Sequence, residues 1–195
     1  MAIFIEAGHN VNDPGAVSGK IVERDLTIDF KKDLKYFFDR KKKQYPKMKV
    51  YYDNDSWSLG KTISEFSSII KHKDVLVSIH FNSSTNPKST GSECFVSDKA
   101  SQESLNLADK LTKTNSLVLG VKNRGVKNES QSNRGRLGIL NMKGVAVLSE
   151  PVFINNSEDV ANYFKDNGAM KCWLAEDYVA HIVELDKKLN PQDYV

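Results

Sequence analysis

The sequence opens with a short apolar run that stops at Gly8 and is followed at once by His9. The run predicts a buried strand, and the Asp-Pro-Gly sequence at positions 13–15 is a strong turn signal. The strand therefore brings His9 to its carboxyl end, the edge at which open α/β sheets bind ligands. A lone histidine at such a position is more often structural, so a role as a metal ligand requires partners elsewhere in the chain.

Apolar runs and amphipathic stretches alternate along the rest of the chain. Apolar positions at helical spacing predict helices over residues 23–40, 58–72, 101–112 and 174–189, and short apolar runs predict strands over 48–52, 75–81, 93–97 and 144–153. This alternation predicts an α/β three-layer sandwich, in which a central, mostly parallel mixed sheet has helices on both faces. We expect the strands at 48–52 and 93–97 to lie at the edges of the sheet.

Residues 115–138 contain few periodic apolar residues and many Asn, Ser, Gly and Arg residues. This composition predicts a long, mobile loop beside the site, because long loops in compact domains often serve function. No internal repeat, low-complexity tract or linker divides the sequence, and a length of 195 residues suits a single domain over residues 1–195.

Composition argues against several classes of protein. The net charge of +3 gives no indication of nucleic-acid binding, and no apolar run approaches the length of a membrane span. The two cysteines, Cys94 and Cys172, form no Cys-x-x-Cys motif and indicate neither a thiolate zinc site nor a disulfide framework. No basic and apolar leader precedes the first strand, so we expect no signal peptide and synthesis in a cytoplasm.

The charge is distributed unevenly along the chain. Residues 31–49 hold nine Lys or Arg and two Asp, a net charge of +7 for this segment. One interpretation is a solvated helix face followed by a loop. The other is attraction to an anionic polymer such as a bacterial cell wall.

Three further polar residues stand where predicted elements begin or end. Glu23 lies on the apolar stripe of the first helix, where a carboxylate is unusual unless it is paired or bound to a cation. His80 and Glu150 each come at the carboxyl end of an apolar strand. The alternative for Glu23 is a first-turn acid that complements the helix dipole, and the alternative for Glu150 is a buried acid paired with Arg124 or Arg134.

Two histidines and one glutamate form a recognised zinc-binding set, and here they are His9, Glu23 and His80. Three protein ligands leave a position for water, and the metal lowers the pKa of that water and polarises a substrate carbonyl. A second carboxylate that does not bind the metal can take the proton of the water and pass it to a leaving nitrogen, and Glu150 fits that role. The spacing alone is weak support, because it contains no short signature such as His-Glu-x-x-His.

Several short motifs follow one another in a family-specific order. They are Gly8-His9 with Asp13-Pro14-Gly15-Ala16, Glu23 at a helix start, Tyr52-Asp53-Asn54-Asp55, Val77-Ser78-Ile79-His80-Phe81-Asn82, Gly91-Ser92-Glu93-Cys94-Phe95, Asn123-Arg124-Gly125-Val126-Lys127, and Val147 to Asn156. In this order, from residue 3 to about residue 160, they resemble the zinc-dependent N-acetylmuramoyl-L-alanine amidases of the type-3 group. The chain departs from that pattern at Asn10 and Val11, where glycines are usual, and at Tyr52, where an arginine is usual.

The resemblance implies an α/β sandwich with a mixed sheet and one bound Zn²⁺. The residues that it implies are His9, Glu23 and His80 for zinc, Glu150 for catalysis, and Arg124, Arg134 and Asn82 for substrate binding. Arg124 is the first candidate for contact with the stem peptide, and Arg134 belongs to a second Asn-Arg-Gly sequence.

The activity that the resemblance implies is hydrolysis of the amide between the lactyl group of muramic acid and L-alanine in peptidoglycan. The chain would then resemble the catalytic domain of a phage endolysin, acting on the cell wall as a monomer. Two alternatives stay open: a zinc peptidase that cuts within the stem peptide, and a non-catalytic wall-binding domain on the same fold. The presence of all three ligands and Glu150 argues against the second alternative.

Overall fold

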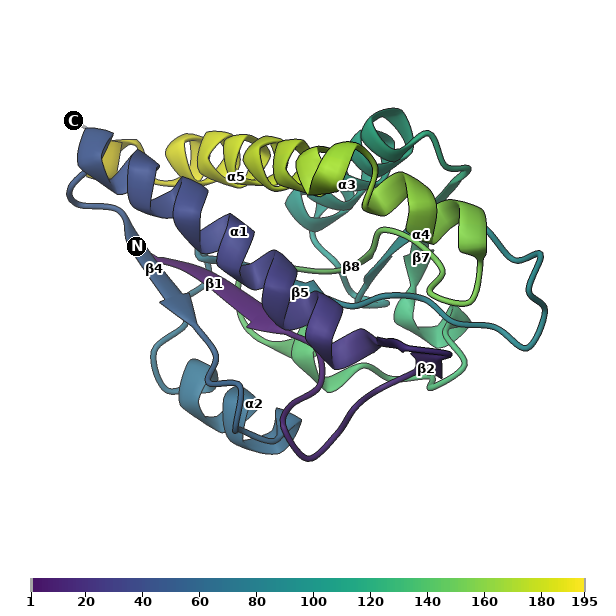
Figure 1. The fold of residues 1–195 in the computed structure, drawn as a ribbon. Helices are drawn as coiled ribbons and strands as arrows, with labels where there is room; N and C mark the ends of the chain where they lie inside the picture. The colour runs from purple at the N-terminus through teal and green to yellow at the C-terminus, as the bar shows by residue number, and fades with distance from the viewer. Residues whose placement is uncertain (1, 195) are drawn as a thin grey trace.

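The computed structural model describes residues 2–194, and its centre is a six-stranded mixed sheet (Figure 1). In spatial order the strands are β4 (Lys49–Tyr52), β1 (Ala2–Ala7), β5 (Val75–Ile79), β8 (Val145–Glu150), β6 (Ser92–Val96) and β7 (Asn123–Asn128). β6 runs antiparallel to β8, whereas the other neighbouring strands pair in parallel. A short hairpin of β2 (Val17–Ser18) and β3 (Ile21–Val22) follows β1. The prediction of a mostly parallel mixed sheet is confirmed.

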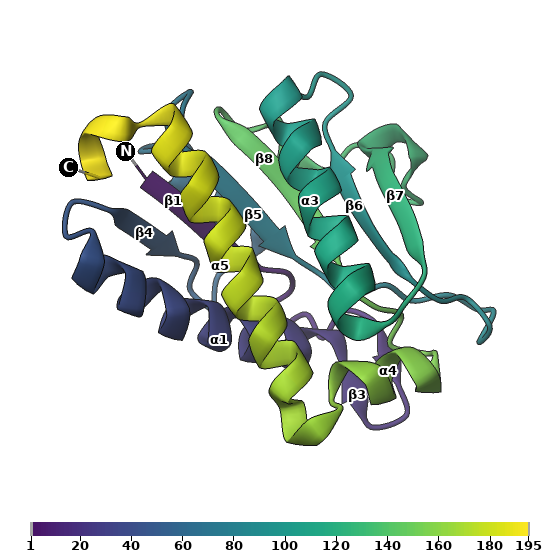
Figure 2. The ribbon, with the colours of Figure 1, turned by 90° about the horizontal axis from the view of Figure 1, so that it is seen from above.

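Helices cover both faces of the sheet. The helices α1 (Glu23–Gln44), α3 (Gln102–Leu119) and α5 (Ala169–Leu189) lie over one face, with the short α4 (Ser157–Tyr163) at their end (Figure 2). The other face carries α2 (Leu59–Ser67) and the 3-10 turn η2 (Gly138–Asn141), whose apolar residues share one cluster. Further 3-10 turns are η1 (Glu129–Gln131), η3 (Asp166–Gly168) and η4 (Pro191–Tyr194). The predicted three-layer α/β sandwich is therefore confirmed.

The central strands are apolar on both faces because both faces are covered. In β1, Ile3 and Ile5 pack under α1 and α5, while Phe4 packs toward α2 from the opposite face. In β8, Val147 likewise packs in the cluster under α1 and α5, and Leu148 packs in the cluster on the α2 face. With both faces covered, the carboxyl ends of β1, β5 and β8 form an edge at which the sheet presents polar side chains to solvent.

The prediction of one long loop over residues 115–138 was wrong. Residues 115–119 continue α3, which ends at Gly120 in the left-handed conformation, and residues 123–128 form the edge strand β7. The amide of the buried Asn115 donates a hydrogen bond to Ser92 Oγ, so a polar residue that indicated a loop instead fastens the helix to the sheet. The prediction that the strand at 93–97 lies at an edge was wrong, because β7 pairs with β6 and makes it interior. The prediction for 48–52 is confirmed, since β4 is an edge strand.

The two cysteines are free thiols, Cys94 buried and Cys172 half-buried, in agreement with the sequence. Among residues 2–194, no helix combines the length and the apolar character that crossing a membrane requires. The α1 stripe also folds as predicted, since its apolar residues are buried; these are Leu26, Phe30, Leu34 and Phe37.

Candidate metal centre and active site

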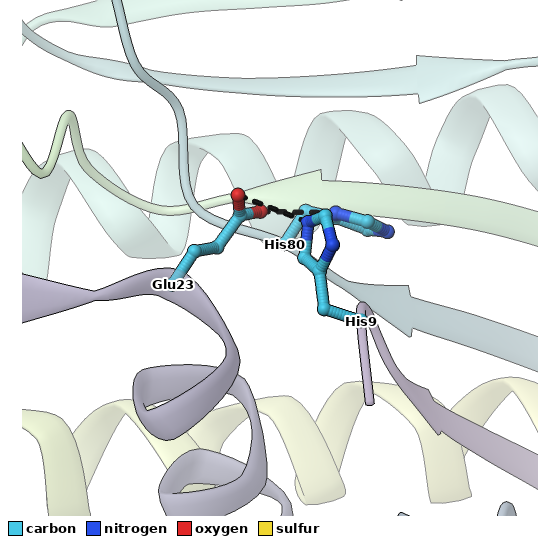
Figure 3. A group of neighbouring side chains, drawn as sticks. All are labelled: His9, Glu23 and His80. Atoms are coloured by element: carbon cyan, nitrogen blue, oxygen red, sulfur yellow. Dashed lines mark hydrogen bonds and ion pairs between the residues drawn. The ribbon is translucent and has the colours of Figure 1, made fainter. Parts of the chain in front are cut away.

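Three side chains converge at the carboxyl ends of β1 and β5. His9 follows β1, His80 follows β5, and Glu23 is the first residue of α1 (Figure 3). Glu23 Oε2 lies 3.0 Å from His9 Nε2, and Glu23 Oε1 lies 3.0 Å from His80 Nδ1. One potential ligand atom from each residue lies within 4.8 Å of the other two. The structure thus brings together the three residues that the sequence grouped.

The backbone leaves room for this convergence at two glycines. A Cβ atom on Gly8 would lie 2.3 Å from the His80 ring, and one on Gly15 would lie 2.6 Å from the His9 ring. Gly15 also has φ +66°, a conformation that favours glycine. His9 itself has φ +74°, which is uncommon for a residue other than glycine, so the loop holds it in a strained conformation.

Glu23 is fixed by the backbone as well as by the histidines. Its side chain accepts the Ala16 N–H through Oε2 and the Phe81 N–H through Oε1, both at 3.0 Å. The residue is only 5% exposed. The prediction that Glu23 faces inward from the first helical turn is confirmed, and a simple interaction with the helix dipole does not account for its four contacts.

The ionisation of the cluster follows from these contacts. Burial would raise the pKa of Glu23, but its close contacts with the His80 and His9 rings outweigh that effect and hold the pKa well below its usual range. Burial would lower the pKa of each histidine, yet the Glu23 carboxylate raises both. The carboxylate is therefore charged, and the two imidazoles are good acceptors for a proton or a cation.

The arrangement fits a bound cation better than an internal hydrogen-bond network. The side chain of His9 is only 3% exposed, and its Nε2 is a buried atom that makes no hydrogen bond despite lying 3.0 Å from Glu23 Oε2. Buried polar atoms without a partner are rare in proteins, and a metal ion would satisfy this one. Imidazole and carboxylate donors suit zinc.

The other ring nitrogen of His9 has a partner of its own. Nδ1 lies 3.0 Å from Asp13 Oδ2, while Asp13 Oδ1 accepts the Gly15 N–H. The bond with His9 holds the pKa of the Asp13 carboxyl below its usual range. A carboxylate on the far nitrogen of a ligating histidine fixes the tautomer and the orientation of the ring.

Glu150 ends β8 and lies half-buried in the same cleft. Burial raises its pKa to about 7; the neighbouring Glu93 and Glu23 carboxylates also raise it, whereas His80 and Lys127 lower it. Among residues 2–194 no arginine forms an ion pair with Glu150, so the alternative of a buried acid paired with Arg124 or Arg134 is not what the structure has.

Arg124 and a second cation bind a different acid, Glu93, which sequence reasoning gave no role. Arg124 Nε and Lys127 Nζ each lie 2.5 Å from Glu93 Oε2, and the Asn82 amide donates to Glu93 Oε1 at 2.6 Å. Burial would raise the pKa of Glu93, but the two cations hold it below its usual range. Glu93 is the ladder partner of Glu150, so the antiparallel pairing of β6 and β8 brings this charged group beside Glu150.

These groups line one cleft with a volume of about 590 Å³. It contains the three converging residues, Glu150, and all the substrate-binding candidates, which are Asn82, Arg124 and Arg134. Arg124 also lies 4.9 Å above the ring of Phe153, which orients its guanidinium. Arg134 lies in the segment between η1 and η2, near enough to Asp13 to lower the pKa of that carboxyl.

The chain is similar to known proteins along most of its length. A family model described as N-acetylmuramoyl-L-alanine amidase (Amidase_3) matches residues 3–180. The endolysin of Bacillus phage SPP1 is 25% identical over 190 residues, which cover 95% of this chain and 67% of that protein. The N-acetylmuramoyl-L-alanine amidase LytC of Bacillus subtilis strain 168 is 27% identical over 174 residues, which cover 86% of this chain and 33% of that protein. A solved structure of an N-acetylmuramoyl-L-alanine amidase from Clostridium difficile 630 matches with a TM-score of 0.75 at 25% identity, over 94% of this chain and 95% of that one.

Proposed function

Because the chain belongs to the N-acetylmuramoyl-L-alanine amidase family (Amidase_3), we propose that it is a zinc-dependent hydrolase of peptidoglycan. The bond that it cleaves is the amide between N-acetylmuramic acid and L-alanine. The observation that carries the proposal is the convergence of His9, Glu23 and His80 beside Glu150 in one cleft. The sequence match over residues 3–180 includes all four residues.

His9, Glu23 and His80 are the residues that would hold the zinc ion. When bound there, the ion would polarise the substrate carbonyl and lower the pKa of water. Glu23 contributes the single negative charge, and the two backbone N–H groups that bind it keep it in place. Asp13 orients His9 because its carboxylate accepts a hydrogen bond from His9 Nδ1.

Glu150 moves the proton in this mechanism. Its carboxylate takes a proton from the attacking water and, once protonated, donates it to the nitrogen of the leaving L-alanine. Burial favours the neutral form and brings the pKa of Glu150 to about 7, so both forms are accessible near neutral pH. A group with a pKa near the working pH is suited to acting first as base and then as acid.

Arg124, Arg134 and Asn82 are proposed to bind the substrate. Each lines the cleft that holds Glu150. Arg124 can capture a carboxylate of the stem peptide, since a guanidinium presents paired donors. Its Nε donates to Glu93 and its Nη1 to the Thr90 carbonyl, and the contact with Phe153 directs the remaining donor of the guanidinium.

The test is release of peptides from purified peptidoglycan, with and without a metal chelator. We expect mass spectrometry to find peptides with a free L-alanine amine and intact glycan, and we expect the chelator to stop release and added zinc to restore it. Fragments cut within the stem peptide would identify the zinc peptidase instead. Binding to the wall without any release would identify a non-catalytic wall-binding domain.

A further inference from the structure

A second cleft adjoins the metal centre on the β4 side of the sheet. It has a volume of about 590 Å³, and its lining includes Asn10, Asn12, Asp13, Trp57, Leu59 and Lys61. We refer to it as the Trp57 cleft. It shares Leu59 with the catalytic cleft, and Asp13 on its edge binds the ring of His9. The two clefts are therefore neighbouring parts of one surface.

The strand order places the functional groups in a line across the sheet edge. Beginning at the β4 edge, the line runs from the Trp57 cleft, in the connection that follows β4, to His9 after β1 and His80 after β5. It continues through Glu150 at the end of β8 and Glu93 in β6 to the two cations of β7. The metal centre thus has chemically different surroundings on its two sides.

The Trp57 cleft offers an aromatic side chain and uncharged amides, and its two charged residues already have partners, Asp13 with His9 and Lys61 with Glu65. Trp57 is half-buried and lines the cleft. Asn10 is only 9% exposed, and its Oδ1 accepts the Asn12 N–H at 2.9 Å, which leaves its NH₂ group with no partner among the described residues. An aromatic face and amide groups match the apolar face and the acetamido group of an N-acetylated sugar.

The opposite end of the line offers charge. Arg124 and Lys127 contribute two cations there, and a single carboxylate, that of Glu93, contacts both. This side suits the carboxylates of a peptide, not an uncharged sugar.

From this polarity we propose that the Trp57 cleft binds the glycan strand of peptidoglycan, while the stem peptide extends over the Arg124 side. The inference rests on the proposed function, and it assigns the sugar subsite and the direction in which the substrate lies. Glu150 stands between His80 and Glu93, on the peptide side of the metal centre. A group that protonates the leaving nitrogen has to stand on that side, because the nitrogen belongs to the peptide.

Sugar binding can be measured without any reaction. The probe is chitotetraose, a tetramer of N-acetylglucosamine that carries acetamido groups but no peptide, and binding is measured by calorimetry. We expect Trp57→Ala to weaken binding about tenfold, as loss of one aromatic contact and its buried area implies, and Trp57→Phe to retain most of the affinity. Asn12→Ala, at an exposed position where the fold is not at risk, should weaken binding more mildly.

The chain offers a matched control in its second tryptophan. Trp173 lies in α5, which covers the face of the sheet opposite α2 (Figure 1), and is 57% exposed. Trp173→Ala should bind chitotetraose as the parent protein does, and cellotetraose, which lacks acetamido groups, should bind neither protein. Absence of chitotetraose binding, or equal loss in the two tryptophan variants, would overturn the proposal.

Kinetics then separate this inference from the proposed function. On polymeric peptidoglycan, Trp57→Ala should raise KM about tenfold with little change in kcat, because the sugar subsite lies outside the reacting groups. If the parent protein releases peptides and Trp57→Ala has the same KM on polymeric peptidoglycan, the sugar subsite is wrong and the amidase function stands. If the parent protein binds chitotetraose through Trp57 and releases nothing, the function is wrong and the subsite stands.

Discussion

The two halves of the catalytic cleft hold their functional groups by different means. On the β1 and β5 side, glycines without room for a side chain and two backbone N–H groups set the positions of His9, Glu23 and His80. On the β8, β6 and β7 side, the groups hold one another through ion pairs centred on Glu93. Loss of one ligand from a site whose geometry the backbone fixes should remove metal binding completely. Loss of one charge from a cluster of ion pairs should change the electrostatics of the cluster only partly. We therefore expect substitutions in the first half to remove the metal and substitutions in the second to change rate, affinity or pH dependence.

The largest effect is expected for His9→Ala. Removing one of three ligands should abolish both metal binding and amidase activity, because two protein ligands leave the ion weakly held. Metal content by atomic spectroscopy and peptide release from peptidoglycan measure the two losses. A variant that keeps one zinc and its activity would show that His9 is not a ligand.

Glu150→Gln tests the other half most directly. The amide keeps the shape of the side chain and removes the proton acceptor, so activity should fall on the order of a hundred- to ten-thousand-fold. The variant should still bind one zinc and melt close to the parent protein, in contrast to His9→Ala. Digestion of peptidoglycan at a near-parental rate would remove Glu150 from the mechanism.

Asp13→Asn tests whether the metal centre on the β1 and β5 side also depends on a side chain that does not bind the metal. The substitution keeps an oxygen for the Gly15 N–H but removes the charge that orients His9, and metal affinity should fall about 10- to 100-fold. Competition with a chromogenic chelator measures this affinity directly. Asp25→Asn is the matched control, because Asp25 is an exposed acid of the same region that pairs with Arg24. Equal affinities for both variants would contradict a role for Asp13.

Arg124→Ala should affect substrate binding without affecting the metal. We expect KM for peptidoglycan to rise about tenfold, since a charge-assisted contact with a carboxylate is lost, while zinc content stays at one. Arg134→Ala should have the smaller effect, because no ion pair fixes its guanidinium among the described residues. Parental kinetics in both variants would show that neither arginine contacts the substrate.

The smallest effect is a shift of the pH profile. Glu150 has to be ionised to accept a proton, so kcat/KM should rise with pH through its pKa, which burial raises to about 7. Glu93→Gln removes a like charge and should move this acid limb to lower pH; Lys127→Ala removes a cation and should move it to higher pH. Each shift should be a few tenths of a pH unit to about one unit. His80 and Glu23 also face Glu150 and are unchanged in both variants. Shifts in the same direction would contradict the assignment of this limb to Glu150.

The contrast between the two halves of the cleft also explains which site residues could be predicted from the sequence. His9, Glu23 and His80 could be found because each stands at the end of an apolar strand or at the start of an amphipathic helix. Parallel β1 and β5 bring the two histidines to the same edge without further information. Their geometry depends on local chain direction, which apolar periodicity predicts well.

Glu93 and β7 could not be found in this way. The position of Glu93 beside Glu150 depends on the antiparallel direction of β6, which no local pattern specifies. β7 is polar apart from Val126, and Gly125 lies at an irregularity in its pairing with β6, so pairing and not propensity makes it a strand. One signal in the sequence could have identified Glu93 as a buried acid. The period-two alternation in β6 puts it on the same face as the buried Phe95.

The site also bears on how well the protein resists proteolysis. Glu23 and His80 are 57 residues apart, and Glu23 begins a helix of 22 residues. A cation held between them would tie the start of α1 to two strands, and at a hundredfold excess over its Kd it would add about 2.7 kcal/mol to the free energy of unfolding. Scarcity of metal would then loosen the amino-terminal turn of α1 and expose the neighbouring hairpin to proteases. The lifetime of the protein in the presence of proteases would then follow the metal concentration, independently of its catalytic rate.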